Sequence, residues 1–183
     1  YPELLLMELP DDSPLKQPLV TIQKSGGKAA AIVQDLLTLA RRGVVHNEVI
    51  KPNQIIREYQ DSPEFLHLEK QHPHVSFTYD LEEELLDVLA SPVHLSKALM
   101  NLVINATEAQ LVEGEVVVAT HNRSLDQSLA AYETIAAGDY AVVCVQDSGV
   151  GIAAQDLERI VEPFYTKKKL SRSGTGLGMS VVW

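Results

Sequence analysis

Two asparagines and a glutamate lie at helical spacing in the segment HLSKALMNLVINATEAQ, residues 94–110. Asn101, Asn105 and Glu108 fall at positions i, i+4 and i+7, so they would share one helix face while apolar residues occupy another. This row of oxygen ligands suits Mg²⁺, which takes few protein oxygens and completes its shell with water and phosphate. A solvated polar face is the alternative, although asparagine is a poor helix former and an unusual choice for such a face.

An acidic residue followed by glycines comes directly after an apolar run, in Asp147-Ser148-Gly149-Val150-Gly151. A carboxylate at the end of a strand can project into a cleft and accept a hydrogen bond from an exocyclic amine. Gly149 and Gly151 would let a ligand approach the backbone closely. The alternative is an ordinary turn, because Asp-Ser-Gly is common turn sequence.

Two later stretches could contact phosphate. Residues 162–169, EPFYTKKK, place two aromatics beside three lysines. Lysine pairs with phosphate oxygens and an aromatic can fasten a lid, whereas a solvated charge run is the alternative. Residues 174–178, GTGLG, precede an apolar run, and glycines at a helix start offer backbone N–H groups to an anion. Their spacing matches neither the dinucleotide-binding fingerprint nor the P-loop.

The first 43 residues predict a helical hairpin. Residues 1–9 would form the incoming helix, and Ser13 can cap the outgoing one. Small or apolar residues then recur at alternating steps of four and three, the pattern of a coiled-coil seam. Two helices rarely bury such a stripe alone, so we expect half of a dimeric four-helix bundle; packing against the rest of the chain is the alternative. The seam residues are Leu15, Leu19, Ile22, Gly26, Ala29, Val33, Leu36 and Ala40.

Residues 44–183 mix strand and helix patterns and predict an α+β sandwich. Two stretches, 61–74 and 123–138, read as polar connections. The pattern pairs the first two expected strands as a hairpin and makes the last apolar enough to be central. The strands are expected at 75–80, 85–90, 115–122 and 139–147. The helices are expected near 53–60, from 92 to near 111, at 153–161 and from near 177.

The overall composition restricts the class of protein. The chain has 183 residues, 45% of them hydrophobic and 22% charged, which is ordinary for a globular protein with a core. Its formal net charge of −10 argues against nucleic acid as a partner. No apolar run approaches the ~18 residues that span a bilayer, and no signal peptide is present at the start of the sequence. The single cysteine, Cys144, lies in an apolar run that predicts a buried thiol.

In this order, the four motifs resemble the catalytic ATP-binding domain of bacterial sensor histidine kinases, within the gyrase and chaperone ATPase superfamily (the Bergerat fold). The segment before them looks like the second helix of that family's dimerisation hairpin. The resemblance implies a partial dimerisation and phosphotransfer hairpin over 1–43 and an ATP-binding catalytic domain over 44–183 that lacks its C-terminal part. It implies a homodimer that transfers the γ-phosphoryl of ATP to a histidine and onward to an aspartate of a response-regulator receiver domain. A cytoplasmic location follows, with the parent protein either membrane-anchored or free.

The resemblance also assigns roles, with ATP and Mg²⁺ as cofactors. Asn105 matches the Mg²⁺-binding asparagine, and Asp147 matches the aspartate that reads the adenine amino group. Asn101 matches the second asparagine, a place where ATP-hydrolysing relatives carry a glutamate that activates water. An amide cannot take a proton, which favours a kinase over an ATPase. The other implied ATP-binding positions are Gly149, Gly151, Phe164, Lys168, Gly174, Thr175, Gly176, Leu177 and Gly178.

Two features depart from the family pattern. The phosphoacceptor histidine, expected upstream of Tyr1, is absent, and none of the six histidines replaces it by context. The resemblance also predicts a further helix and edge strands after Trp183. We therefore expect a piece of a longer kinase, trimmed at both ends, that cannot be its own phosphate acceptor. Two other functions stay open, an ATPase of gyrase or chaperone type and a non-enzymatic dimeric module that senses nucleotide.

Overall fold

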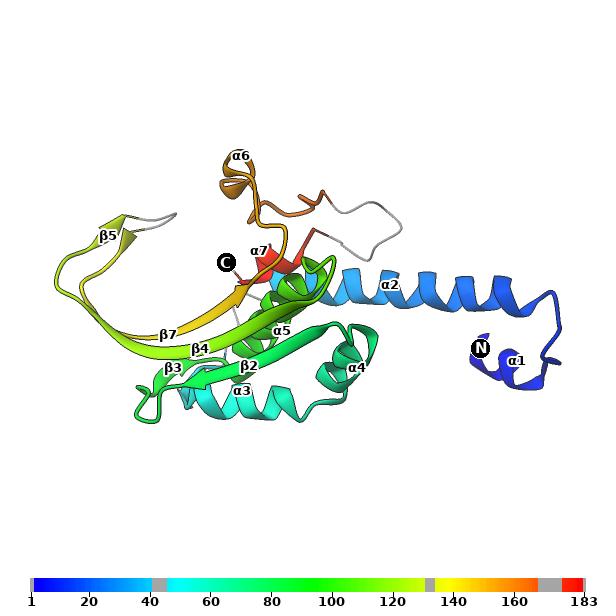
Figure 1. Ribbon diagram of the computed structural model, residues 1–183, viewed down its shortest axis with the longest axis horizontal. Helices are drawn as coiled ribbons and strands as arrows, with labels where there is room; N and C mark the ends of the chain where they lie inside the picture. Colours follow the sequence, from blue (N-terminus) through cyan, green and yellow to red (C-terminus); the bar gives the residue numbers. More distant parts are fainter. Residues whose placement is uncertain (1, 41–45, 131–133, 168–175, 183) are drawn as a thin grey trace.

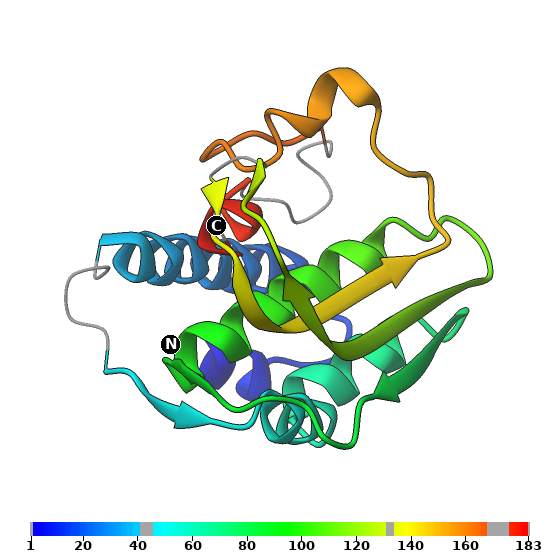
Figure 2. The same cartoon turned by 90° about the vertical axis from the view of Figure 1, so that its left-hand side faces the viewer.

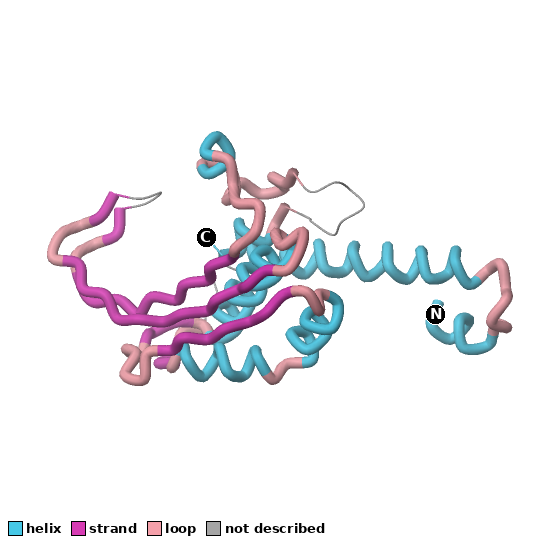
Figure 3. The backbone as a smooth tube through the Cα atoms, viewed as in Figure 1, coloured by secondary structure: helices cyan, strands magenta, loops and turns pink. Residues whose placement is uncertain are grey.

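The chain folds into an α+β body from which a long helical hairpin projects, as the computed structural model in Figure 1 shows. The structure describes residues 2–40, 46–130, 134–167 and 176–182. The body has two layers, a sheet and the helices that cover one of its faces (Figure 3). The predicted α+β class is therefore confirmed.

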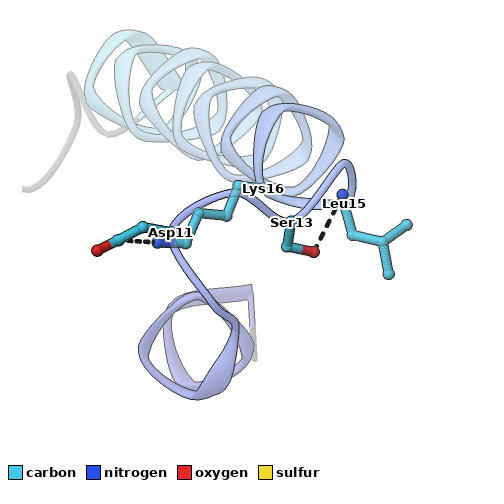
Figure 4. Close-up of polar contacts among 4 residues, drawn as sticks. All are labelled: Asp11, Ser13, Leu15 and Lys16. Carbon is cyan, nitrogen blue, oxygen red and sulfur yellow. Dashed lines mark hydrogen bonds and ion pairs between the residues drawn. The ribbon is translucent and has the colours of Figure 1, made fainter.

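The hairpin consists of α1 (Pro2–Glu8) and α2 (Lys16–Ala40), as the sequence predicts. In the turn between them, the Leu15 N–H donates to Ser13 Oγ (3.4 Å), and the Lys16 ammonium lies 2.5 Å from a carboxylate oxygen of Asp11 (Figure 4). Ser13 thus helps to satisfy the free N–H groups at the start of the outgoing helix. The hydrogen bond from Lys16 holds the pKa of Asp11 below its usual value.

The predicted apolar stripe of α2 is largely exposed in the single chain. Leu15 and Ile22 are each 58% exposed and Val33 is 54% exposed. Among the described residues, the most extensive contacts of α2 are with α1 and with α7 (Gly178–Val182), which lies beside it (Figures 1 and 2). Most of the described stripe is therefore not covered by the chain's own body, contrary to the alternative expectation.

Among the described residues, three strands form the main sheet, in the order β2-β4-β7. β2 (Val75–Leu81) runs parallel to β4 (Gly114–Leu125), and β4 runs antiparallel to β7 (Gly138–Asp147). The parallel pair is connected through α5 (Pro92–Glu108), whose start is capped by Ser91, since its Oγ accepts from the His94 N–H at 3.4 Å. This crossover lays α5 against the sheet, as parallel pairing requires.

The core lies between the sheet and three helices, α3 (Pro52–Gln60), α4 (Pro63–Gln71) and α5. Phe65 connects the layers, because its ring centroid lies 5.4 Å from that of Tyr59 and 5.0 Å from that of Phe77, both in edge-on geometry. The side chains of this cluster are Ile56, Tyr59, Phe65, Leu68, Leu99, Val103 and Val118.

The predicted hairpin between residues 75–80 and 85–90 is wrong. β3 (Val88–Ala90) pairs instead with β1 (Glu48–Ile50), in a separate antiparallel ribbon. The intervening loop is fastened to β4, since Asn122 accepts from the Leu86 N–H (2.9 Å) and donates to the Glu84 carbonyl (2.7 Å). These bonds direct the chain away from β2, so that β2 is free to pair with β4.

The stretch 61–74 is not a simple connection, because it contains α4. Ser62 caps this helix by accepting from the Phe65 N–H at 3.2 Å, and Pro63 occupies its first turn. The same Ser-Pro signal opens α5. The short helix buries Phe65 and Leu68, too few apolar positions to give a clear period in the sequence.

In the described part of the chain, β7 is an edge strand of this sheet and β4 is the central one, contrary to the prediction. Cys144 is exposed rather than buried, since it lies opposite Ala119 on the sheet face away from the helices. The stretch 123–138 continues the β4–β7 ladder as far as the pair Leu125 and Gly138. β5 (Leu129–Ala130) and β6 (Thr134–Ile135) pair beyond it, so this stretch is a hairpin arm that curves away from the body (Figure 1).

Candidate functional site

A cavity of about 640 Å³ lies along α5. Its volume is in the range of small-molecule sites, roughly 300–1,000 Å³. The walls come from α5, the end of β7, the loop 150–153, α6 (Ala154–Leu157), and the segments 165–167 and 176–179. The predicted site residues on its surface are Asn101, Asn105, Asp147, Gly151, Gly176 and Gly178.

The two faces of α5 have different environments. Leu99 and Val103 are 2% and 0% exposed and belong to the core. Asn101, Asn105 and Glu108 line the cavity together. Asn101 is itself buried, and its amide Nδ2 donates to the carbonyl of Gly178 at 3.1 Å. Since this amide fastens α7 to α5, Asn101 already performs one structural task.

Asp147 lies at one end of the cavity, where β7 ends. One of its carboxylate oxygens accepts from the Gly149 N–H at 2.8 Å, which fixes the side chain. Gly149 is not on the cavity surface but lies against α5, where an added Cβ would come within 2.6 Å of the Ala109 carbonyl oxygen. The Val150 N–H also donates to that oxygen, at 3.3 Å. The glycine therefore allows the loop to pack on the C-terminal end of α5.

Gly176 lines the opposite end of the cavity, and Phe164, which is not on the cavity surface, packs against it. The Phe164 N–H donates to the Gly176 carbonyl at 2.9 Å, and both residues have positive φ, 67° and 70°. A Cβ on Gly176 would lie 2.5 Å from the Phe164 carbonyl carbon, so only glycine fits. Phe164 as a whole residue is 62% exposed, and its backbone makes the contact with Gly176. Leu177 is fully buried and lies off the cavity, while Lys168, Gly174 and Thr175 lie outside the described residues.

Asp156 is a buried acid on the cavity wall that the sequence interpretation missed. It is 8% exposed and accepts two hydrogen bonds, from the Tyr165 hydroxyl at 2.7 Å and from the Lys167 ammonium at 2.5 Å. The Arg159 guanidinium lies 4.3 Å from the Tyr165 ring centroid, a cation–π distance. The sequence offers only a weak signal for this cluster, because an acid in a short helix is usually a solvated surface group.

The hydrogen bond from Lys167, and then that from Tyr165, hold the pKa of Asp156 below its usual value. A lowered carboxyl pKa stabilises the fold above the unfolded-state value of about 3.9, and the contribution is lost as the pH falls through the lowered pKa. The carboxylate of Asp156 is therefore ionised across the neutral range. Its hydrogen bonds in turn raise the pKa values of Tyr165 and Lys167.

The charges on the cavity wall are mostly negative. Among the described lining residues, the acids are Glu108, Asp147 and Asp156, and Lys167 is the base. No group of three His, Cys, Asp or Glu side chains in the described part of the chain could hold a metal. A divalent cation in this cavity would thus depend on one or two protein oxygens and on oxygens of the ligand, as Mg²⁺ commonly does. None of the described helices has the length and hydropathy required to cross a bilayer.

The fold and the cavity together define a class of protein. A mixed sheet is covered by helices on one face, an asparagine-bearing crossover helix forms the cavity floor, and two glycine loops fasten its ends. This is the arrangement of the histidine kinase, gyrase and chaperone type of ATPase. The family model described as "Histidine kinase-, DNA gyrase B-, and HSP90-like ATPase" matches residues 90–182, and the chain belongs to this family.

Curated relatives are sensor kinases. The chain is 29% identical over 182 residues to sensor kinase CckA of Brucella abortus, covering 99% of this chain and 19% of that protein. It is 28% identical over 174 residues to sensor histidine kinase ZraS of Klebsiella oxytoca, covering 94% of this chain and 33% of that one. These relatives confirm the resemblance to sensor histidine kinases, and the chain spans only a fifth to a third of their length.

Solved structures of histidine kinases share this fold. The catalytic domain of histidine kinase ThkA matches with a TM-score of 0.55 and 26% identity, over 74% of this chain and 76% of that one. Full-length ShkA in complex with AMPPNP matches with a TM-score of 0.68 and 21% identity, over 97% of this chain and 35% of that one. ThkA in complex with response regulator protein TrrA matches with a TM-score of 0.61 and 24% identity, over 93% of this chain and 48% of that one.

The substitution Gly176→Ala should loosen the end of the cavity. The new Cβ would collide with the Phe164 backbone, and alanine at positive φ costs about 1–2 kcal/mol. We expect the Phe164 amide, which bonds to Gly176, to exchange with solvent roughly tenfold faster, because about 1.4 kcal/mol corresponds to that factor. Hydrogen exchange followed by NMR measures this rate.

Gly178→Ala is the matched control in the same motif. Its Cβ would lie 3.6 Å from Asn101 Cγ, an ordinary contact, so the exchange rate of the Phe164 amide should stay at the wild-type level. Equal rates in wild type and Gly176→Ala would contradict the close backbone fit.

Proposed function

We propose that this chain is the ATP-binding catalytic part of a sensor histidine kinase, with part of its dimerisation hairpin. The intact kinase would bind Mg²⁺–ATP and transfer the γ-phosphoryl to a histidine nitrogen, with ADP leaving. The phosphohistidine would then supply an aspartate of a response regulator. The observation that carries this proposal is the single cavity that Asn101, Asn105, Asp147 and Gly176 line together.

The adenine would bind at the Asp147 end. The fixed carboxylate of Asp147 can accept a hydrogen bond from the exocyclic amine, because the Gly149 N–H uses only one of its oxygens. Apolar side chains beside it, including Ile152 and Val145, suit the faces of a base. Gly151 gives the ring access to the backbone, since an added Cβ there would meet no atom within 4 Å and the space is open.

The phosphates would bind at the Asn101 end, toward Gly176 and Gly178. Asn105 would hold Mg²⁺ through its amide oxygen, with phosphate oxygens and water completing the shell. The bound ion would draw charge from the phosphates, while the protein's own contribution is positioning. By resemblance, Lys168, Gly174 and Thr175 would complete the phosphate contacts, and Leu177 and Phe164 would fasten that loop to the body.

Asn101 favours a kinase over an ATPase. A water-activating group must accept a proton, and an amide cannot do so. The Asn101 amide instead donates to the Gly178 carbonyl, which occupies its nitrogen with a structural bond. The nucleotide-sensing module remains the rival that a complete binding cavity alone does not exclude.

The substitution Asp147→Asn should weaken ATP binding by at least about tenfold. A hydrogen bond to a charged acceptor is worth about 1.5 kcal/mol or more, and the neutral amide loses that charge. Isothermal calorimetry with Mg²⁺–ATP measures the effect. Asp126→Asn, which removes the same charge from the exposed hairpin arm, is the control and should bind like wild type. Equal affinity of Asp147→Asn and wild type would exclude the adenine-reading role.

The transfer reaction requires a longer polypeptide that includes the helix upstream of Tyr1, because no histidine of this chain lies in the hairpin. Incubation with γ-labelled ATP should leave an acid-labile, base-stable label on the protein, as expected of phosphohistidine. Rapid phosphate release without labelling would favour the ATPase. Nucleotide binding with neither outcome would favour the sensing module.

We further propose the division into a hairpin over 1–43 and a catalytic domain over 44–183; residues 41–45, where the boundary falls, lie outside the described residues. The hairpin would dimerise through the exposed seam of α2. Both exposed helices carry apolar side chains that a second copy would cover, among them Leu4, Met7, Ile22 and Val33. A patch of this kind on a helix pair is typical of a four-helix interface.

The substitution Ile22→Glu should shift the chain from dimer toward monomer, because it places a charge in the apolar seam. Sedimentation velocity at micromolar concentrations measures the change. Gln17→Glu, which adds the same charge to α2 at an exposed position off the seam, should leave the dimer intact. A monomeric wild-type chain would contradict the proposed interface.

A response-regulator receiver domain is the proposed macromolecular partner, docking near the hairpin. The solved complex of ThkA with response regulator protein TrrA supports this class of partner, since its kinase chain shares the fold. We also propose a cytoplasmic location for this part of the kinase, where ATP is available, whether or not the parent protein carries a membrane anchor.

A further inference from the structure

Four hydrogen bonds close a ring around the cavity, and the ring begins and ends on α5. The Asn101 amide holds α7, Gly176 holds Phe164, Tyr165 reaches across to α6, and the loop after β7 returns to the C-terminal end of α5. The polypeptide segments between the bonded residues complete the ring. The four pairs are Asn101 with Gly178, Gly176 with Phe164, Tyr165 with Asp156, and Val150 with Ala109.

The link at Asp156 differs from the other three. It joins two side chains, whereas the others use the backbone on at least one side. Asp156 is 8% exposed, and it accepts from both Tyr165 and Lys167, which lie two residues apart and also line the cavity. The backbone between the Phe164 contact and Lys167 is thereby tied to α6 by one carboxylate.

Two described features next to this link are more exposed than Asp156. Phe164 is 62% exposed, and the ion pair between Arg159 and Glu162 is about half exposed on both sides, at 55% and 51%. Exposed pairs of this kind contribute little to the order of a segment. The Asp156 side chain is 11% exposed, whereas that of Lys167 is 61% exposed, so the firmer of its two bonds is the one from the Tyr165 hydroxyl.

We propose that Asp156 is a positioning residue of the nucleotide site, which holds Tyr165 and Lys167 on the cavity wall and keeps Phe164 against Gly176. This inference rests on the proposed ATP-binding function of the cavity. Asp156 acts through its two partners and has no bond to the nucleotide. Its contribution to affinity is preorganisation, because a wall already fixed loses less conformational freedom when the ligand binds.

If Asp156 only stabilised the start of α6, its substitutions would give a different order of ATP affinities. Asp156 lies in the first turn of α6, where any acid stabilises the helix start. Glu158→Gln removes a charge of the same sign from an exposed position two residues away and serves as the control. Asp156→Asn keeps an oxygen that can accept from Tyr165 but loses the charge that holds Lys167, and Asp156→Glu retains both capacities. Positioning therefore predicts the affinity order wild type, Glu, Asn, Ala.

The first measurement is the Kd of Mg²⁺–ATP by calorimetry. We expect Asp156→Ala to bind roughly tenfold more weakly, Asp156→Glu to recover most of the loss, and Glu158→Gln to match wild type. Tyr165→Phe should weaken binding in the wild-type background and have almost no effect in Asp156→Ala, because the same bond is already absent. Additive losses, or no recovery by glutamate, would overturn the proposal.

The second measurement needs no nucleotide. Hydrogen exchange of the Phe164 amide should be roughly tenfold faster in Asp156→Ala than in wild type and unchanged in Glu158→Gln. An unchanged rate in Asp156→Ala would overturn the proposed hold on the wall, as would a faster rate with unaltered ATP affinity. If the wild-type chain binds no ATP, the proposed function fails and Asp156 is not a positioning residue for nucleotide, whatever the exchange rates.

Discussion

The packing of α5 against the sheet is the interaction on which the rest of the structure depends. Leu99 and Val103 bury one face of the helix in the core, which turns Asn101, Asn105 and Glu108 toward the cavity. Gly178 and Gly149 contact the helix at Asn101 and Ala109, eight residues apart, or about 12 Å at 1.5 Å per residue. The length of the cavity is therefore set by two turns of one helix, and any shift of α5 on the sheet would move both ends together.

The glycines of the two motifs are needed for close packing between backbone segments as much as for contact with a ligand. Gly149 is required by the Ala109 carbonyl, and Gly176 by the Phe164 backbone. A family motif usually interpreted as a phosphate loop is here also a packing motif. Among the described lining residues, Glu108, Asp147 and Asp156 outnumber Lys167, so a cation that accompanies a polyphosphate would also offset the negative charge of the wall.

Features that depend on short stretches of sequence were predicted correctly. The cap at Ser13, the helical spacing in α5 and the apolar strand before Asp147 all lie within short windows, and these elements were found. The pairing of β2 with β4 was not predicted. It joins residues far apart in sequence, and it depends on bonds that Asn122 makes to a loop. The hairpin arm was missed because a ribbon exposed on both faces has no alternation to detect. Asp156 was missed because its burial depends on Tyr165 and Lys167, which only the fold brings to it.

The parallel pair also orders events during folding. β4 meets β7 through a short connection, with Leu125 opposite Gly138, so this ladder can form early as a local hairpin. β2 meets β4 with Val75 opposite Gly114, a closure that encloses the whole of α5. Because the chain entropy of that larger loop is lost before its contacts form, we expect the β2–β4 pairing to come late. The cavity would then be among the last parts of the molecule to form, because it requires the β2–β4 pairing that packs α5 against the sheet.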